Sequence, residues 1–393
     1  AVGANALAAN TTGTTNTAVG TNALDANTTA SYNTAVGYAA LGANTTGSGN
    51  TAVGKDAMKA LTTATDGVAV GWAALDACTT GVSNSAVGYN ALGAVTTGGS
   101  NTAMGFVALQ LATGTGNVAI GANSSDALTT GATNTSVGTG SLGACTTGGN
   151  NTAIGSSALA ANTTASGNVA VGWDSLLSCT TGTGNTAVGY TALDAVTTVN
   201  DNTAVGYQAL TANTTGDSQT AVGTNALLSN TTGANHTAVG KDALSSNTTG
   251  QQNTAFGAFA LDASTTSGYN VAVGYGAIDA NTTGDNNTGV GRGALGVNTT
   301  TSNLTAVGYG ALGANTTGHN NTAVGSNALL VCSTGTYNTA IGNYALDAHL
   351  GSGATAVGAN ALGANTTGGS NTAVGQTALA ANTTGADNTA VGL

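Results

Sequence analysis

The feature that most constrains this chain is a tandem repeat that fills it from end to end. The glycine that closes each AVG-type triplet recurs every 17 residues from Gly3 to Gly392, and the step shortens to 16 only in 105–121 and 342–358. Both deletions fall in a threonine-rich turn, so that turn is predicted to be a loop and the rest a framework. We expect one repeat array, 1–393, which is a fragment of a longer array because both ends interrupt the unit.

The repeat reads N-T-A-V-G-x-x-A-L-x-A-N-T-T-G-x-x when it is written as columns 1 to 17. In residues 16–32, for example, column 1 is Asn16 and column 5 is Gly20. Column 4 is always apolar, column 9 is nearly always Leu, and columns 3, 8 and 11 are nearly always small. Each unit thus has two larger apolar side chains beside several alanines. These are too few to form a core, so neighbouring units must stack to bury them. This predicts that columns 4 and 9 both point inward.

Composition excludes most other classes of protein. Only 5% of the residues are charged, against about 25% in globular domains, while 41% are hydrophobic, which disfavours disorder. Collagen is excluded by the absence of Pro and of a three-residue Gly period, and coiled coils by the absence of heptads. No apolar run approaches the ~18 residues of a membrane helix, so we expect no membrane insertion. The thinly spread net charge of -11 argues against nucleic acid.

The repeat predicts an all-β fold, a parallel β-solenoid (a β-roll or β-helix) with one 17-residue unit per coil. Glycine in columns 5 and 15 and β-branched residues in columns 2, 4, 13 and 14 disfavour a helix. Stacking about 23 coils at ~4.8 Å each would give a rod on the order of 110 Å long. The glycines of columns 5 and 15 are expected at bends that need a positive φ.

The phrase NTAVGxxAL, seen at 185–193 and 202–210, resembles the YadA-like (haemagglutinin-type) head repeats of trimeric autotransporter adhesins. Similar repeats occur in phage and algal-virus fibre proteins. The resemblance implies a parallel β-roll, a homotrimer, and an extracellular location on a cell surface, a secreted filament or a virion fibre. The unit here is longer than the family pattern because it carries an added NTTG turn.

Column 6 is the most variable position of the frame, and it holds most of the aromatic residues. It also accepts Lys and Arg, so it must reach water, and exposed aromatic rings suit sugar rings or another apolar surface. The alternative is that the rings cover alanines or meet in an interface between chains. The candidate binding residues of this exposed aromatic column are Tyr38, Trp72, Tyr89, Phe106, Trp173, Tyr190, Tyr207, Tyr275 and Tyr309.

Column 12 reads as an N-glycosylation sequon in many units, because Asn is followed by Thr-Thr. The same column also accepts Leu61, Val95 and all four cysteines, which favours an inward position and a ladder of hydrogen-bonded Asn side chains. Glycosylation is the alternative. The residues concerned are Asn10, Asn27, Asn44, Asn162, Asn213, Asn230, Asn247, Asn281, Asn298, Asn315, Asn365 and Asn382.

Nothing in the sequence predicts catalysis, a metal site or a cofactor. The nearest cysteines, Cys145 and Cys179, lie two coils apart, about 9.5 Å by the stacking estimate, which exceeds disulfide reach; free buried thiols are expected. The three histidines, His236, His319 and His349, occupy three different columns and share no face. Asp recurs in column 10, where we expect a solvated edge.

The sequence therefore predicts a non-enzymatic, extracellular structural fibre or adhesin that associates with copies of itself. The column 6 aromatics would add weak contacts to a cell-surface glycan, which repetition along the array would strengthen. One alternative is an ice-binding solenoid that uses the Thr columns 2, 13 and 14. Another is a purely architectural matrix filament without a ligand.

Overall fold

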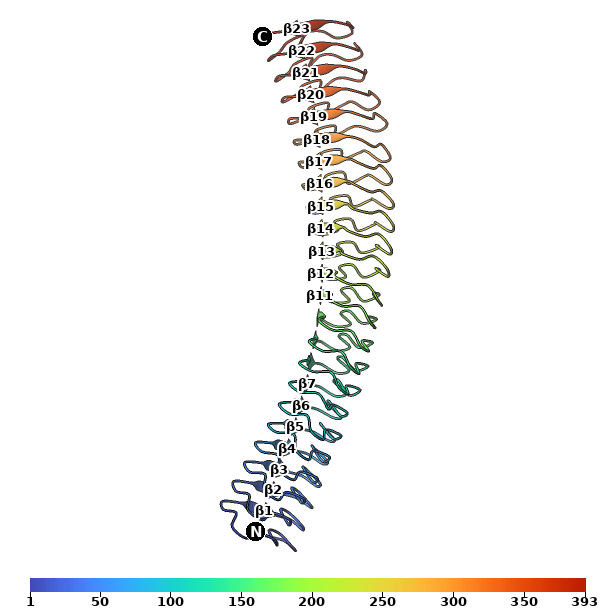
Figure 1. Cartoon of the computed structure of the whole chain (residues 1–393). Coiled ribbons are helices and arrows are strands. Elements are labelled where there is room, and N and C mark those ends of the chain that lie inside the picture. Colours follow the sequence, from blue (N-terminus) through green and yellow to red (C-terminus); the bar gives the residue numbers. More distant parts are fainter. The chain divides into compact units, whose positions relative to one another are not determined.

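The computed structural model describes residues 1–393, and its regular secondary structure consists of one three-residue strand per repeat, formed by columns 2 to 4. The chain divides into two compact units, Ala1–Asn200 and Asp201–Leu393. Within each unit the strands of successive coils lie one above another (Figure 1).

The strands of the first unit are β1 (Thr17–Val19), β2 (Thr34–Val36), β3 (Thr51–Val53), β4 (Val68–Val70), β5 (Ser85–Val87), β6 (Thr102–Met104), β7 (Val118–Ile120), β8 (Thr135–Val137), β9 (Thr152–Ile154), β10 (Val169–Val171) and β11 (Thr186–Val188). Those of the second unit are β12 (Thr203–Val205), β13 (Thr220–Val222), β14 (Thr237–Val239), β15 (Thr254–Phe256), β16 (Val271–Val273), β17 (Thr288–Val290), β18 (Thr305–Val307), β19 (Thr322–Val324), β20 (Thr339–Ile341), β21 (Thr355–Val357), β22 (Thr372–Val374) and β23 (Thr389–Val391).

Each strand pairs in parallel with the strand of the next coil, from β1 to β11 in the first unit and from β12 to β23 in the second. Like columns face each other, as in Ala18↔Ala35. The two 16-residue units keep this register, because Thr102 pairs with Val118 and Thr339 with Thr355. The parallel β-solenoid prediction is confirmed, and the deletions are absorbed in the loop.

The interior of each coil is narrow and is filled by columns 3, 8 and 9. Ala18, Ala23 and Leu24 are at most 1% exposed, and the same columns are buried in nearly every coil. The prediction that column 9 closes the core is confirmed.

The prediction that column 4 is also buried is wrong. Every strand has its middle residue buried or half-buried and its two outer residues more exposed, and Val19 keeps 40% of its surface in water. Successive side chains of a strand point to opposite faces, so an inward Ala in column 3 forces columns 2 and 4 outward. The Leu of column 9 fills the space opposite the strand, which leaves room for alanine there but not for valine.

The chain returns from one strand to the next through tight turns between columns 5 and 12. In one coil, Ala23 N–H donates to Gly20 O at 3.3 Å, and Asn27 N–H donates to Leu24 O at 3.2 Å. Asn22 has a φ of 56° and Leu24 a φ of 50°; a positive φ at the third residue, as at Asn22, is the signature of a type II turn. A left-handed Leu costs about 1–2 kcal/mol, which its complete burial offsets.

The column 5 glycines have φ values near that of Gly37, 136°, and a Cβ there would lie 2.4 Å from Gly54 O of the next coil. This confirms the expected bend at column 5. The same expectation for column 15 is wrong, because Gly47 does not have a positive φ, and Ala30 and Ala64 occupy that column in other coils.

Candidate functional site

The column 12 asparagines point into the coil and form the expected ladder. Asn27 Nδ2 donates to Asn10 Oδ1 at 2.8 Å, and Asn44 Nδ2 donates to Asn27 Oδ1 at 3.3 Å and to Gly47 O at 2.9 Å. Asn10 and Asn382 are half-buried. A glycan on a fully buried amide conflicts with the folded coil. The fully buried members of the sequon set are Asn27, Asn44, Asn162, Asn213, Asn230, Asn247, Asn281, Asn298, Asn315 and Asn365.

A second ladder, which the sequence analysis missed, runs along column 1. Asn33 N–H donates to Asn16 Oδ1 of the preceding coil at 3.0 Å, and Asn33 Nδ2 donates to Gly47 O at 3.0 Å. The amides of columns 1 and 12 therefore converge on the same column 15 carbonyl. The signal that could have revealed it is the near-constant Asn in column 1, a position at which a solvent-exposed residue would vary.

The four cysteines are free and buried, and each takes the place of a column 12 amide. Cys78 Sγ donates to Gly81 O at 3.4 Å and Cys179 Sγ to Gly182 O at 3.4 Å, the interaction that Asn Nδ2 makes elsewhere. Burial raises the pKa of Cys145 and of Cys179 to about 11, so these thiols stay protonated donors.

Two of the three histidines replace ladder asparagines. His236, in column 1, accepts a hydrogen bond from Asn253 N–H at Nδ1 (3.1 Å), and its Nε2 lies 2.7 Å from Gly250 O. His349, in column 12, lies 3.2 Å from Asn365 Nδ2 through Nδ1, and its buried Nε2 has no partner. Burial lowers the pKa of both imidazoles. No three His, Cys, Asp or Glu side chains are grouped so that they could hold a metal ion.

The aspartates of column 10 form a half-buried row rather than a fully solvated edge. Burial is the main cause that raises the pKa of five of them above the usual value, and neighbouring carboxylates add to it at Asp76, Asp194 and Asp279. The five are Asp76, Asp126, Asp194, Asp279 and Asp347.

All nine column 6 aromatics are exposed, but many of their ring faces contact one another. Tyr89 stacks on Phe106 with centroids 5.3 Å apart and meets Trp72 edge to face, also at 5.3 Å. Trp173 stacks on Tyr190 at 4.9 Å. Rings stacked along the coil axis offer mainly their edges to solvent, so these ladders are poor platforms for a sugar ring.

The column 6 cations extend these stacks. Lys55 Nζ lies 4.9 Å from the Trp72 ring centroid. Arg292 lies between two rings, with Cζ 5.9 Å from the Tyr275 centroid and 6.0 Å from that of Tyr309. Such cation–π contacts contribute ~0.5–1 kcal/mol each at exposed sites.

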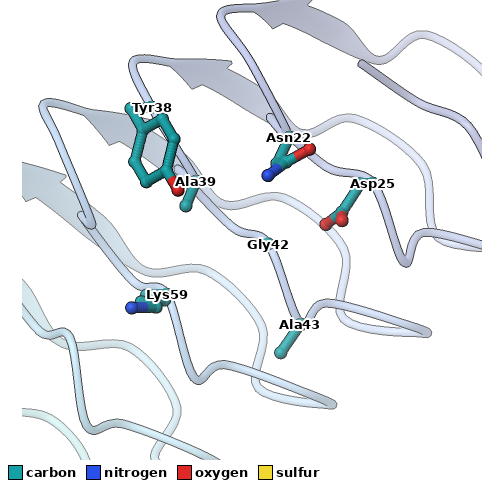
Figure 2. A pocket seen from close by; sticks show the side chains of 7 residues that line it. All are labelled: Asn22, Asp25, Tyr38, Ala39, Gly42, Ala43 and Lys59. Atoms are coloured by element: carbon teal, nitrogen blue, oxygen red, sulfur yellow. The ribbon is translucent and has the colours of Figure 1, made fainter. Parts of the chain in front are cut away.

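A pocket of about 320 Å³ opens on the turn face of the first unit (Figure 2). Its centre is Gly42, which leaves a gap in the column 10 row between Asp25 on the preceding coil and Lys59 on the following coil. Tyr38 and Asn22 complete its polar and aromatic lining, and two alanines lie beside Gly42.

The outward face of the strands has uniform chemistry, and we name it the Thr–Val face. In each unit it consists of columns 2 and 4 of the strands, β1 to β11 in the first and β12 to β23 in the second, none of which is buried. Column 2 holds only Thr, Val or Ser, and column 4 only Val, Ile, Met or Phe, so no strand places a charge on this face. Sequence reasoning missed the face because it assigned column 4 to the core.

No helix of the structure has the length and apolar character that crossing a membrane requires. No protein-family model and no curated protein matches the chain.

Proposed function

We propose that the chain is a non-enzymatic structural protein whose β-solenoid units associate side by side with copies of the same chain through the Thr–Val face. The observation that carries the proposal is the exclusion of charge from both outward columns of every strand, although both columns reach solvent. The charged residues of the chain lie in other columns, chiefly 6, 7, 10, 16 and 17. A solvent-facing surface without a partner would not need this restriction.

A second copy is the occupant that fits the repetition of the face. The face presents one Val-type side chain per coil, at the ~4.8 Å spacing of paired strands. Only a partner with the same spacing can make an equivalent contact at each coil, and a second solenoid unit has that spacing. β-Branched Val and Thr side chains also lose little conformational entropy when they are covered.

The energetics require many coils to act together. Val19 is already more than half covered, so covering the rest of a column 4 side chain contributes roughly 0.5–1 kcal/mol per coil. Summed over the strands of one unit, this is about 5–10 kcal/mol, comparable with the ~4–15 kcal/mol that association costs. Contributions from column 2 add to it. A long array of identical coils is the economical way to make such weak contacts sufficient.

The proposed location is extracellular, as in a surface adhesin, a secreted filament or a virion fibre. Its support is the resemblance of the NTAVGxxAL phrase to YadA-like head repeats, which also suggests a trimer as the associated state. The stacking of the column 6 rings on one another supports the structural role for these ladders over broad glycan contact by the whole column.

The test compares lysines placed in two outward columns of the same coils. Ile120→Lys with Ile154→Lys places two charges on the Thr–Val face, at side chains 37% and 40% exposed. Ala122→Lys with Ser156→Lys places the same charge in column 6, which accepts Lys elsewhere. Light scattering after size-exclusion chromatography should show that the unmodified chain and the column 6 variant are associated and that the column 4 variant is monomeric. The proposal fails if both variants associate alike while circular dichroism shows that they are folded.

Ice binding is the second candidate, and one observation now favours it. The hydroxyls of column 13 are used along the axis, as in Thr28 Oγ1 to Thr45 O at 3.1 Å, but column 2 gives a regular Thr rank on the outward face beside Val. A chain that stays monomeric and depresses the freezing point of water below its melting point would establish this function instead of self-association.

A further inference from the structure

The pocket at Gly42 differs from the rest of the turn face because a missing side chain opens it. Column 10 reads Asp25, Gly42 and Lys59 on three successive coils, so an acceptor and a donor flank the gap about 9.6 Å apart by the stacking distance. Figure 2 shows Asn22 and Asp25 on one coil, with their polar groups turned toward the space over Gly42. Its volume of about 320 Å³ is at the lower end of the ~300–1,000 Å³ typical of small-molecule sites.

Tyr38 supplies an open aromatic face at this pocket. The next cation along column 6, Lys55, lies over the Trp72 ring and pairs with Asp56 at 3.1 Å. Tyr38 therefore has no aromatic or cationic neighbour stacked on it, unlike Tyr89, and it is 51% exposed. An aromatic ring that is not covered by its neighbours can stack on the apolar face of a sugar ring.

The polar groups around the pocket suit a neutral ligand rich in hydroxyls. Asn22 accepts from Asn5 Nδ2 at its Oδ1 (3.0 Å), which leaves its own Nδ2 as a donor. The Asp25 carboxylate can accept, and the Lys59 ammonium, 3.6 Å from an Asp56 oxygen, can donate. The charges of Lys55 and Lys59 balance those of Asp25 and Asp56, so the region attracts neither sign of ion strongly.

We propose that this pocket binds one neutral hexose or N-acetylhexosamine unit of a glycan. Tyr38 stacks against the apolar face of the ring, Asp25 and Asn22 take hydroxyl groups on one side of Gly42, and Lys59 takes a hydroxyl on the other. The site does not depend on the Thr–Val face, which lies on columns 2 and 4, so it can be present whether or not the chain associates.

Comparable gaps elsewhere in the chain lack this combination. Gly143 follows Asp126 in column 10, as Gly42 follows Asp25, but the column 6 residue of its coil is Thr139. Gly93 follows an aspartate and has Tyr89 in its coil, but Asn90 Oδ1 lies so close that it would overlap a Cβ built at Gly93. Gly143 is therefore a matched control position.

The experiment uses saturation-transfer difference NMR on the full chain with the methyl glycosides of glucose, galactose, mannose and N-acetylglucosamine. We expect at least one to bind with a roughly millimolar Kd, given the size of the ligand. Tyr38→Ala removes the platform, and Gly42→Asp fills the gap with a residue that column 10 accepts in many coils, at a backbone without positive φ. Each should weaken binding about fivefold or more, whereas Gly143→Asp should leave it unchanged.

Three outcomes overturn the proposal. The first is that none of the four glycosides gives a signal. The second is a signal that persists equally in Tyr38→Ala and Gly42→Asp. The third is that methyl glucuronide, added as a charged arm, binds while the neutral glycosides do not. Thermal melting of each variant verifies that a lost signal comes from a folded chain.

Discussion

At the level of single residues, the buried asparagines of columns 1 and 12 stabilise the interior of the coils through hydrogen bonds. The exchange of Asn with Leu, Val and Cys in column 12 was enough to predict an inward position, because no exposed site needs residues of that kind. The column 1 ladder had only the near-constancy of its Asn as a signal, which is weaker than the exchange seen in column 12 because a constant polar residue also suits a turn. Its role follows from the coil geometry, in which Asn33 and Asn44 both donate to Gly47 O.

The two buried histidines predict a specific dependence of stability on pH. Burial lowers the pKa of His236 and His349 in the folded state below the usual 6.5. Above pH ~6.5 both states are neutral and stability does not change on this account. As pH falls below that value the unfolded chain binds protons and the folded chain does not, so the free energy of unfolding should fall by up to ~1.4 kcal/mol per pH unit per histidine.

The control is His236→Asn with His349→Asn, which restores the residue that both columns hold in most coils. Denaturant unfolding at pH 7.5, 6.0 and 5.0 should show the acid-side loss in the native chain and a smaller loss in the variant. The half-buried aspartates have raised pKa values and the opposite sign, because the folded state gains stability as they protonate. The native chain and the variant contain the same aspartates, so the contribution of these aspartates cancels when the free energies of unfolding of the two proteins are subtracted. Identical pH profiles would contradict the assignment of neutral, buried imidazoles.

At the level of structural elements, successive coils compensate for one another: a changed residue in column 9 of one coil is matched by a smaller residue in column 3 or column 1 of the next coil. Gly289 replaces the usual Ala of column 3 where Ile278 replaces the usual Leu of column 9, and a Cβ on Gly289 would lie 2.5 Å from Ile278 Cγ1. Gly67 replaces the column 1 Asn beside Met58, whose Cε would lie 2.7 Å from a Cβ there. The space beside column 9 is thus shared with the next coil, which leaves no room there for a side chain as large as Val in column 3.

Gly289→Ala tests this compensation in β17. The added methyl group overlaps Ile278, so we expect a loss of about 1–3 kcal/mol in the free energy of unfolding. Gly289→Ala combined with Ile278→Leu recreates the pair found in most coils and should recover most of that loss. Urea unfolding of the three proteins measures both effects. Equal stability of the single and double variants would show that the two side chains do not compete for the same space.

For the whole molecule, most of what could be predicted follows from the repetition of one coil. The 17-residue period and the small residues around Leu24 were sufficient for a parallel solenoid with like columns stacked. The direction in which column 4 points could not be predicted in this way. Val19 is apolar and suits a core and an interface equally, and the width of the coil decides between them. The pocket at Gly42 could not be predicted from the sequence either, since it depends on side chains from three coils.

The proposed covering of the Thr–Val face by a second copy of the chain requires that the chain associates in solution. Sedimentation equilibrium of the unmodified chain over a wide concentration range tests it most directly. We expect a mass of at least twice 36.9 kDa, which falls toward that of one chain only on dilution. A mass of 36.9 kDa at every concentration would contradict it.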